Sequence, residues 1–351
     1  MKYVTLEEVC ENRTSNISQK DLKGNEGIYP IYGASGLIKK VDFYIQDKEY
    51  IGIVKDGAGV GRTMLLPSKS SVIGTMQYII PNGILNIKYL YYALISKKLS
   101  KYSSGATIPH IYFRDYKKEK ILLISEIEQQ KIVSILDNIV SLIEKNKKRI
   151  ILLEELVKSR FIEMFGDPIR NDKGWEITFM NKISIKRGEY ESNKSSTVYD
   201  GGYRYIRITD IKENGTLKEE KVGVMDEEIE VQKYKLEEGD ILFARSGATV
   251  GKTFLYRKKY GNCIFAGYLI RFKLNLNRVN PYYIKHYTDT EYYKKWIKNY
   301  QNIVAQPNIN AKQYGEELKV LLPPLSLQNE FAEFVTKTNK LKFEAEKSLK
   351  E

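Results

Sequence analysis

A ten-residue segment occurs twice in this chain, and this repeat limits what the chain can fold into. VKDGAGVGRT at Val54–Thr63 returns 190 residues later as ARSGATVGKT at Ala244–Thr253, with five identical positions. A cation, Arg62 or Lys252, precedes the final threonine of both copies. This spacing is far longer than the repeat of roughly 20–50 residues that builds a solenoid. The sequence therefore predicts two related domains, each long enough to bury its own core.

Further landmarks follow both copies in the same order, which supports the two-domain interpretation. The series consists of a tyrosine, an asparagine–tyrosine pair, a proline loop, a second tyrosine, an apolar run and a glutamine motif. In the first half these are Tyr78, Asn86 with Tyr89, TIPHI at Thr107–Ile111, Tyr116, Ile121–Ile124 and EQQKI at Glu128–Ile132. In the second half they are Tyr268, Asn280 with Tyr283, QPNI at Gln306–Ile309, Tyr314, Val320–Leu325 and LQNEF at Leu327–Phe331.

Short β-branched and aromatic runs between Gly, Pro and Asn residues indicate that both globular parts are mainly strand. We expect strands at Tyr50–Val54, Thr63–Leu66, Gln77–Ile80, Ile121–Ile124, Tyr203–Ile211 and Gly239–Ala244. One helix is expected at Ile87–Tyr102 and another from Pro281 through Trp296, since proline suits a first helical turn. The predicted fold class is α+β, with two mixed, mainly β domains separated by long α-helices.

The segment between the two halves has a different character. Residues 126–165 contain neither glycine nor proline and are rich in helix formers. Their apolar positions follow the 4-3 spacing of a coiled-coil seam, interrupted by one polar residue of the kind that fixes register. The seam is Ile132, Leu136, Ile139, Ile143, Asn146, Ile150, Leu153 and Val157. Gly166 and Pro168 are expected to end this helix.

A second, shorter helix with a weaker seam is expected after Pro324. We expect the two helices to form an antiparallel coiled coil within the chain; the alternative is that each pairs with another subunit. The predicted boundaries are a first domain at residues 1–125, the central helix at 126–168, a second domain at 169–325 and a C-terminal helix at 326–351.

Composition limits the class of partner. The net charge of +13 and the 27 tyrosines favour a polyanion, with nucleic acid first. The alternative is the codon bias of an AT-rich genome, which enriches Lys, Ile, Asn and Tyr. Cys10 and Cys263 form neither a metal nor a disulfide pattern, and no apolar run approaches the ~20 residues of a membrane span. We therefore expect a cytoplasmic protein without a metal site or a membrane partner.

The arrangement of these parts resembles the specificity subunit of type I restriction–modification systems. The most specific motifs are FGDP after the central helix, GATVGKT at Gly247–Thr253, and PP-L-x-x-Q-x-E-F at Pro323–Phe331. The resemblance covers essentially the whole chain, although the C-terminal helix is shorter than the family pattern. It implies that each globular part is a target recognition domain reading one half of a bipartite double-stranded DNA target. Because the two domains differ in most residues, we expect an asymmetric target.

The resemblance also implies partner subunits. Two methyltransferase subunits would dock on the helices, and a nuclease–translocase subunit would join them for cleavage. S-adenosylmethionine and ATP would be bound by those partners, so we expect no cofactor on this chain. Exposed apolar positions off the seam are the predicted methyltransferase-docking residues, and the alternative is that they widen the intramolecular seam. They are Ile135, Leu142, Leu152 and Leu156.

The GATVGKT motif also suggests the main alternative, a nucleotide-binding or DNA-modifying enzyme. A phosphate-binding loop needs four residues between its glycines, as in G-x-x-x-x-G-K-[ST]. Here three residues intervene, and Ser246 occupies the place of the first glycine. We therefore interpret both copies as a tight strand–turn–strand connection, with or without a ligand, and expect no catalytic residues. A DNA-packaging protein without sequence preference is a further alternative.

Candidate DNA contacts lie in the two glycine segments and the two proline loops. Basic side chains would contact phosphate, Arg245 a guanine edge, Asn and Gln an adenine, and Thr a thymine methyl. The alternative for the asparagines is Asx-turn chemistry. Arg207 is expected to point outward from the strand at Tyr203–Ile211. The candidate DNA-contacting residues are Lys55, Arg62, Thr107, His110, Tyr112, Arg207, Arg245, Ser246, Thr249, Lys252, Gln306, Asn308 and Asn310.

Overall fold

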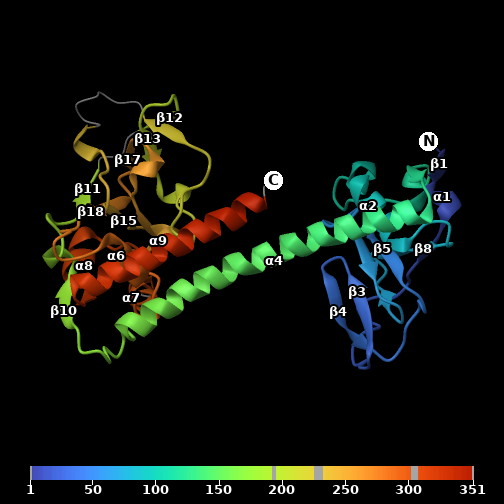
Figure 1. Cartoon of the computed structure of the whole chain (residues 1–351), viewed down its shortest axis with the longest axis horizontal. Helices are drawn as coiled ribbons and strands as arrows, with labels where there is room; N and C mark the ends of the chain where they lie inside the picture. The colour runs from blue at the N-terminus through green and yellow to red at the C-terminus, as the bar shows by residue number, and fades with distance from the viewer. Residues whose placement is uncertain (1, 192–194, 225–231, 302–306, 350–351) are drawn as a thin grey trace. The chain divides into compact units, whose positions relative to one another are not determined.

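The computed structural model describes residues 2–191, 195–224, 232–301 and 307–349. The chain forms two compact units, Met1–Glu144 and Lys145–Glu351, each with its own sheet and helices (Figure 1). Within the described ranges, no helix is both long and apolar enough to cross a membrane.

The first unit is built on a four-stranded antiparallel sheet in the order β2-β8-β5-β6. Its strands are β2 (Cys10–Thr14), β8 (Met76–Pro81), β5 (Tyr50–Val54) and β6 (Thr63–Leu66). A second sheet has the order β4-β3-β7, and β1 pairs with β9. These strands are β3 (Tyr29–Gly33), β4 (Gly36–Val41), β7 (Ser71–Val72), β1 (Lys2–Thr5) and β9 (Lys120–Leu123). The helical segments are α1 (Leu6–Val9), α2 (Ile87–Ser96), η1 (Leu99–Tyr102) and α3 (Phe113–Tyr116).

The second unit repeats this plan with the sheet order β11-β18-β15-β16. Its strands are β11 (Glu189–Tyr190), β18 (Leu269–Phe272), β15 (Ile241–Ala244) and β16 (Thr253–Leu255). Three strand pairs complete the unit: β10 (Glu176–Phe179) with β19 (Lys319–Leu322), β12 (Ser196–Val198) with β14 (Val222–Val224), and β13 (Arg204–Ile206) with β17 (Cys263–Phe265). Its helical segments are η2 (Met180–Lys182), η3 (Ile208–Asp210), η4 (Gly247–Thr249), η5 (Lys258–Tyr260), α6 (Pro281–Tyr287), α7 (Glu291–Gln301) and α8 (Ala311–Glu316). The matching sheet orders confirm the internal repeat that the sequence predicts.

The repeated asparagine, tyrosine and glutamine form a structural joint in the first unit. Asn86 caps α2, and its backbone N–H donates to Oε1 of Gln129 at 2.7 Å. Nε2 of Gln129 donates to the Ile124 carbonyl at 3.0 Å, and this glutamine is buried. The Tyr89 hydroxyl donates to the Leu122 carbonyl at 2.9 Å. These bonds attach the start of the central helix to α2 and to the strand before it.

The same joint recurs in the second unit. Asn280 caps α6, and its N–H donates to Oε1 of the buried Gln328 at 2.8 Å. Nε2 of Gln328 donates to the Pro323 carbonyl at 2.8 Å, and the Tyr283 hydroxyl donates to the Leu321 carbonyl at 2.8 Å. The glutamine motif therefore serves to dock each long helix on its own domain.

The two long helices pair antiparallel within the second unit, as the sequence predicts. Helix α4 (Glu126–Phe165) has 40 residues and ends at Gly166, whose φ is +78°. Helix α9 (Leu325–Ser348) lies against its last turns (Figure 1). Three side-chain pairs show the direction: Arg160 with Glu330 at 3.0 Å, Glu154 with Lys342, and Asn146 with Ser348 at 3.1 Å.

Two expected helices are interrupted in the structure. The helix expected at Ile87–Tyr102 is wrong in extent: α2 ends at Ser96, and Lys98, with a φ of +49°, separates it from η1. The helix expected from Pro281 through Trp296 is divided into α6 and α7. At this break, the hydroxyls of the buried Thr288 and Thr290 each donate to a carbonyl three residues earlier, at 2.7 Å. Local side-chain hydrogen bonds compete with helix continuation in this way.

The segment η1 is fixed by a partly buried carboxylate, Glu119, on the connection between α3 and β9. Glu119 accepts hydrogen bonds from Lys101 Nζ at 2.5 Å and the Tyr102 hydroxyl at 2.7 Å, and Lys97 Nζ lies 3.2 Å away. Burial by itself would raise the pKa of Glu119, but these donors outweigh it and lower the pKa to about 2.

The strand expected at Tyr203–Ile211 is also wrong in extent, because only Arg204–Ile206 form β13. Arg207 is instead the N-cap residue of η3, and Asp210 accepts from its backbone N–H at 2.9 Å and from Nη2 at 2.9 Å. Arg204 is buried, and its Nη2 donates to the carbonyls of Lys218 and Glu220.

The residue of the second unit that corresponds to Tyr78 of the first is the buried Arg271, and not Tyr268 as the sequence comparison predicts. In the strand registers, Tyr78 lies opposite Gly52 on β5, whereas Arg271 lies opposite Leu242 on β15. The expected correspondence of Tyr78 with Tyr268 is therefore wrong by three residues of register.

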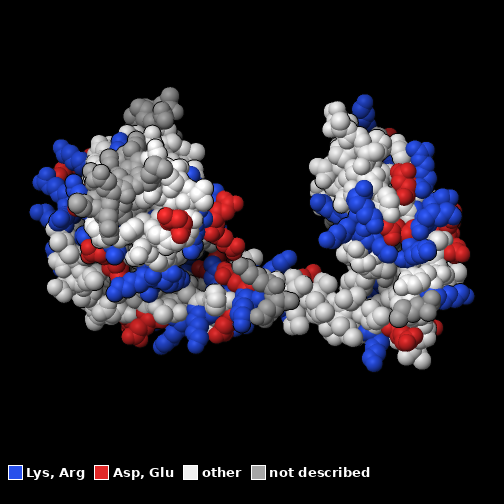
Figure 2. Space-filling model, turned by 90° about the horizontal axis from the view of Figure 1, so that it is seen from above, with Lys and Arg blue, Asp and Glu red and all other residues white. Residues whose placement is uncertain are grey.

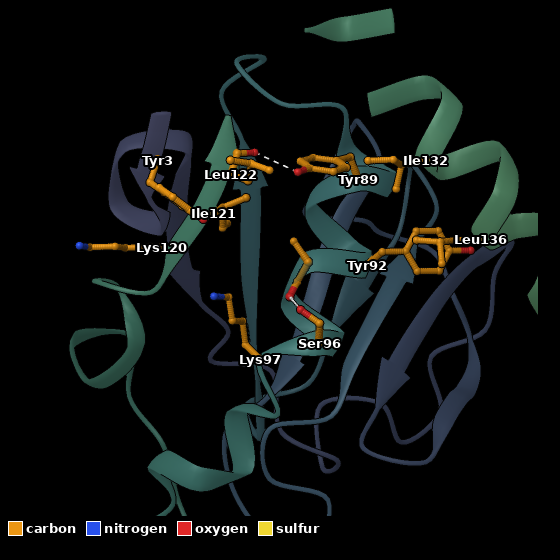
Figure 3. A pocket seen from close by; sticks show the side chains of 11 residues that line it. Tyr3, Tyr89, Tyr92, Ser96, Lys97, Lys120, Ile121, Leu122, Ile132 and Leu136 are labelled. Atoms are coloured by element: carbon orange, nitrogen blue, oxygen red, sulfur yellow. Dashed lines mark hydrogen bonds between the residues drawn. The ribbon is translucent and has the colours of Figure 1, made fainter. Parts of the chain in front are cut away.

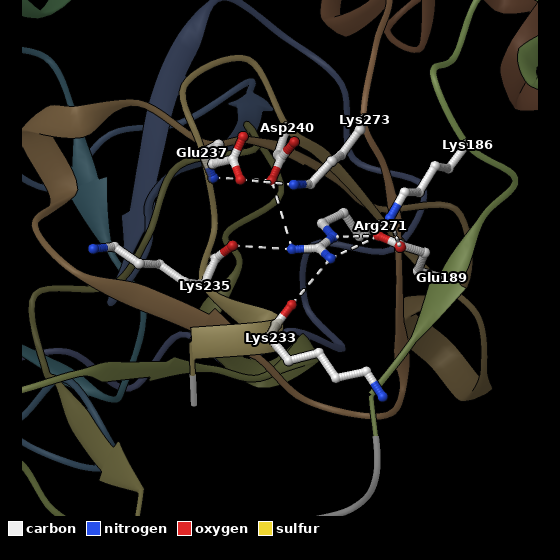
Figure 4. Close-up of polar contacts among 8 residues, drawn as sticks. All are labelled: Lys186, Glu189, Lys233, Lys235, Glu237, Asp240, Arg271 and Lys273. Carbon is white, nitrogen blue, oxygen red and sulfur yellow. Dashed lines mark hydrogen bonds and ion pairs between the residues drawn. The ribbon is translucent and has the colours of Figure 1, made fainter. Parts of the chain in front are cut away.

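Arg271 connects β18 to β11 and to the segment before β15 (Figure 4). Nε and Nη2 donate to Glu189 at 2.9 and 2.6 Å, and Nη1 donates to the Lys235 carbonyl at 3.0 Å. Asp240 lies 3.9 Å from Nη1, and its burial raises its pKa to about 6. Because these acceptors enclose Arg271, its guanidinium is paired inside the second unit and is not presented to solvent.

Candidate nucleic-acid interface

The repeated segment forms the same turn in both units. We call residues 55–62 and 245–252 the Gly loops; each connects the last two strands of its sheet. In the first unit, Gly61 N–H donates to the Val54 carbonyl at 2.9 Å, and Val60 N–H donates to Gly57 at 3.0 Å. In the second, Gly251 N–H donates to Ala244 at 3.0 Å. The predicted strand–turn–strand connection is confirmed.

Close packing explains the glycines that end each turn. Gly61 has a φ of +81°, and a Cβ there would lie 2.4 Å from the Ser100 backbone nitrogen. Gly251 has a φ of +88°, and a Cβ there would lie 2.8 Å from Cγ1 of Ile297. The N–H groups of both glycines already donate to strand carbonyls, so they are not free to wrap a phosphate.

The structure brings the Gly loop of the first unit onto its proline loop. We call residues 107–112 and 307–310 the Pro loops. Gly57 N–H donates to the Pro109 carbonyl at 2.8 Å, and Ile111 N–H donates to the Lys55 carbonyl at 2.9 Å. Asp56 and His110 form an antiparallel bridge between these two bonds.

The second unit forms the same pair of loops from different residues. Gly247 N–H donates to the Pro307 carbonyl at 3.1 Å, and Ile309 N–H donates to the Arg245 carbonyl at 2.8 Å. Ser246 bridges Asn308, so Asn308 occupies the position that His110 has in the first unit. Two motifs that are separate in the sequence therefore form one surface in each unit, which we call the two-loop surface.

Cationic and aromatic side chains line the two-loop surface of the first unit. Arg62 is exposed, and its Nη1 donates to the Ala34 carbonyl at 2.6 Å. Tyr112 is exposed, with the His110 ring 5.2 Å away and the Arg114 guanidinium 4.7 Å from its ring centroid. Thr107 is exposed on the same loop. Lys55 is half-buried, and its Nζ lies 3.7 Å from Asp56. Arg114 is an addition that the sequence did not single out.

In the second unit, the side chain of the candidate residue Arg245 is held in place by two neighbouring side chains. Its guanidinium lies 4.9 Å from the ring centroid of Tyr190, and its Nε donates to Oδ1 of Asn308 at 3.3 Å. The Tyr190 hydroxyl accepts from Ala311 N–H at 2.6 Å, which fixes the ring below the arginine. Tyr190 was missed by the sequence argument because β11 carries no motif and reaches this loop only through sheet pairing.

The other candidates of the second unit are partly engaged within the protein. Lys252 Nζ lies 2.6 Å from Glu213, and the Thr249 hydroxyl donates to the Ser246 carbonyl at 3.0 Å. Asn310 caps α8 by accepting from Gln313 N–H at 2.9 Å. A bidentate contact with adenine needs both atoms of the carboxamide, and the oxygen of Asn310 is already used in this Asx-type cap.

The last two candidates, Gln306 and Arg207, are not placed on the two-loop surface by the structure. Gln306 falls outside the described residues. Arg207 caps the start of η3, where Asp210 holds its guanidinium and raises its pKa.

Lys and Arg side chains gather in patches on both units, with Asp and Glu between them (Figure 2). The cationic patches are those expected of a surface that meets a polyanion.

The four apolar residues predicted to dock a methyltransferase are all exposed. Ile135 and Leu142 are 52% and 59% exposed in the first unit. Leu152 and Leu156 are 52% and 48% exposed in the second unit. About half of the surface of each side chain is therefore open to a partner, and their role in docking stays a prediction.

Comparison with known proteins identifies the family. Residues 1–155 and 172–351 both match the type I restriction modification DNA specificity domain. The MjaIX specificity subunit of a type I restriction enzyme from Methanocaldococcus jannaschii is 25% identical over 261 residues, 67% of this chain and 60% of that protein. The putative MjaX specificity subunit from the same organism is 29% identical over 172 residues, 46% of this chain and 39% of the relative.

Solved structures show the same fold at low sequence identity. The S subunit of a type I restriction-modification system from M. genitalium superposes with a TM-score of 0.65 and 18% identity, over 99% of this chain and 92% of that one. A chain from a structural study of complex assembly in the type I system gives a TM-score of 0.53 at 13% identity, over 99% and 92%. With both halves matched by the same domain, the chain belongs to the type I restriction modification DNA specificity family.

Proposed function

We propose that this chain is a non-catalytic specificity subunit in which each unit reads one half of a bipartite double-stranded DNA target. The observation that carries the proposal is the two-loop surface, which both units build with the same backbone hydrogen bonds. The side chains on that frame differ, with His110 in one unit and Asn308 in the other. A shared frame with different side chains supports two half-sites of different sequence.

Arg245 is the residue we assign to base recognition in the second unit. A bidentate contact to guanine O6 and N7 uses the terminal nitrogens of an arginine, whereas the bond to Asn308 uses Nε. Stacking on Tyr190 limits the rotamers of a side chain that would otherwise lose entropy on binding. Arg62 and Lys252, at equivalent positions of the two Gly loops, would contact phosphate and set register.

The remaining expectations concern partners and place of action. Two methyltransferase subunits would dock on the exposed apolar residues of α4, and nuclease–translocase subunits would complete the complex. Those partners would bind S-adenosylmethionine and ATP, in a cytoplasmic assembly. The exposure of Leu152 and Leu156 beside the α4–α9 pair supports a docking role.

Methylome sequencing of a host that expresses the chain with its methyltransferase partner tests the proposal. A bipartite methylated motif is expected. Arg245→Ala should relax or abolish recognition of one half only, whereas Lys259→Ala, an exposed cation on η5, should leave the motif unchanged. A motif that does not respond when either unit is exchanged would refute the assignment.

The alternative classes have different signatures. Binding of ATP or S-adenosylmethionine by the isolated chain would favour the enzyme alternative. Equal affinity for many DNA sequences at one salt concentration would favour a packaging protein, because phosphate contacts carry no sequence information.

A further inference from the structure

In the second unit, the end of α4 is held in an aromatic socket. Phe161 stacks on Tyr283 with ring centroids 5.5 Å apart, and lies 6.4 Å from Tyr287 and 5.4 Å from Phe331. Phe165, one helical turn later, lies 4.7 Å from Tyr283 and 5.4 Å from Phe331. Both phenylalanines are buried and belong to the main core cluster of the second unit.

The internal repeat identifies the corresponding residues of the first unit. The Asn86 and Asn280 caps align α2 with α6, so Tyr89 matches Tyr283 and Ala93 matches Tyr287. The buried glutamines align the start of α4 with the start of α9, so Ile132 matches Phe331.

These three residues of the first unit line an open pocket of about 320 Å³ (Figure 3). Ile132 is 37% exposed, whereas its counterpart Phe331 is fully buried. Ala93 is smaller than Tyr287, which gives the pocket more room than the socket. The first unit therefore has the walls of the aromatic socket without the helix end that fills the other one.

We propose that this pocket binds the carboxyl-terminal end of an amphipathic helix from another polypeptide, with two aromatic residues four positions apart. Such a pair lies on one face of a helix, as Phe161 and Phe165 do. Those two residues are already buried in the second unit. The exposed aromatic residue of α9, Phe343, has Asn339 and Lys347 at the positions four residues away. The described residues of α4 and α9 thus provide no second pair. The aromatic residues that α6 and α7 carry four positions apart, such as Trp296 and Tyr300, pack in or against the core of the second unit.

Charge and the adjoining seam support the same kind of occupant. Lys97 and Lys120 line the pocket, with Lys97 also 3.2 Å from Glu119. Cations suit the partial negative charge at the carboxyl end of a helix. Leu136 lines the pocket one turn after Ile132, and Ile139 continues the seam with 46% of its surface exposed. An incoming helix would bury this seam, as α9 buries the corresponding face of α4 in the second unit.

Fluorescence anisotropy with a labelled peptide tests the proposal on the full chain. The probe is a peptide of residues 150–168, IILLEELVKSRFIEMFGDP, which carries the natural aromatic pair. Saturable binding is expected, and a peptide with F161A and F165A should bind at least about tenfold more weakly. The Ile132→Lys and Ala93→Trp variants of the chain should each weaken binding by a similar factor. Ile127→Lys, at a 79% exposed position of α4 outside the pocket, should not.

The site of binding needs its own measurement, because the probe can also compete for the socket of the second unit. A photoreactive phenylalanine at position 161 of the peptide should cross-link to Tyr89 or Ile132. Cross-links to Tyr283 or Phe331, equal binding by the three chain variants, or no saturation below about 1 mM would each overturn the proposal. The assay contains no DNA, so its result is independent of the proposed DNA recognition.

Discussion

Replacing Gly61 by alanine tests whether the Gly loop exists to pack against its neighbour. Its φ of +81° costs an alanine about 1–2 kcal/mol. The new Cβ would also lie 2.4 Å from the Ser100 nitrogen and 2.9 Å from the Leu99 carbonyl carbon. Because both are backbone atoms of η1, no side-chain rotation relieves the clash. Overpacking of this kind costs about 1–3 kcal/mol more, so we expect a total loss of about 2–5 kcal/mol.

Gly57 provides the matched control within the same loop. Its φ is +93°, yet a Cβ there would meet nothing within 4 Å. Gly57→Ala should therefore lose only the conformational cost of about 1–2 kcal/mol. Urea unfolding at equilibrium measures both variants, and the difference between them isolates the packing contribution. Equal losses for the two variants would refute the argument that close approach to η1 requires Gly61.

Three further predictions follow from named contacts. Gln328→Leu should lower the free energy of unfolding by about 2–5 kcal/mol, since it leaves the Asn280 N–H and the Pro323 carbonyl unpaired. Urea unfolding measures this loss, and a value below about 1 kcal/mol would contradict the role of Gln328 in docking α9 on its domain. Glu119 should stabilise the first unit above its unfolded pKa of 4.5, and lose that contribution as the pH falls through about 2. The shift implies about 2 kcal/mol after allowance for the half-exposed Lys101, and Glu119→Gln should remove this pH dependence of unfolding. Leu152→Asp with Leu156→Asp should weaken methyltransferase association in analytical ultracentrifugation while leaving the unfolding midpoint within about 0.5 kcal/mol of the parent; unchanged association would remove these residues from the docking surface.

Local sequence patterns predicted the elements whose stability is decided locally. The bounds of α4 follow from helix formers between Glu126 and Phe165 and from the left-handed Gly166 that ends it. The central strand β5 follows from five apolar or glycine residues between turn residues. The interrupted helices at Lys98 and Thr288 were not predictable in this way. Their breaks depend on side-chain and backbone contacts that a helical periodicity does not contain.

The candidate site divides along the same line. The sequence picked out the Gly loops and the Pro loops as separate motifs, because each contains residues with strong backbone preferences. The two kinds of loop pack together through hydrogen bonds between Gly57 and Pro109, and between Gly247 and Pro307. No local sequence pattern specifies these bonds. Tyr190 joins Arg245 only because β11 pairs at the edge of the sheet.

By itself, therefore, the sequence determined that this protein has two related units, a long helix with a coiled-coil seam, and one kind of turn used twice. Periodicity, glycine positions and repeat spacing can be read directly from the order of residues in the sequence. The tertiary structure alone decided which loops meet, which cations are buried, and which of two equivalent sockets is filled. Those outcomes depend on packing between residues far apart in sequence, where Phe161 and Phe165 complete one unit and the matching walls of the other stay open.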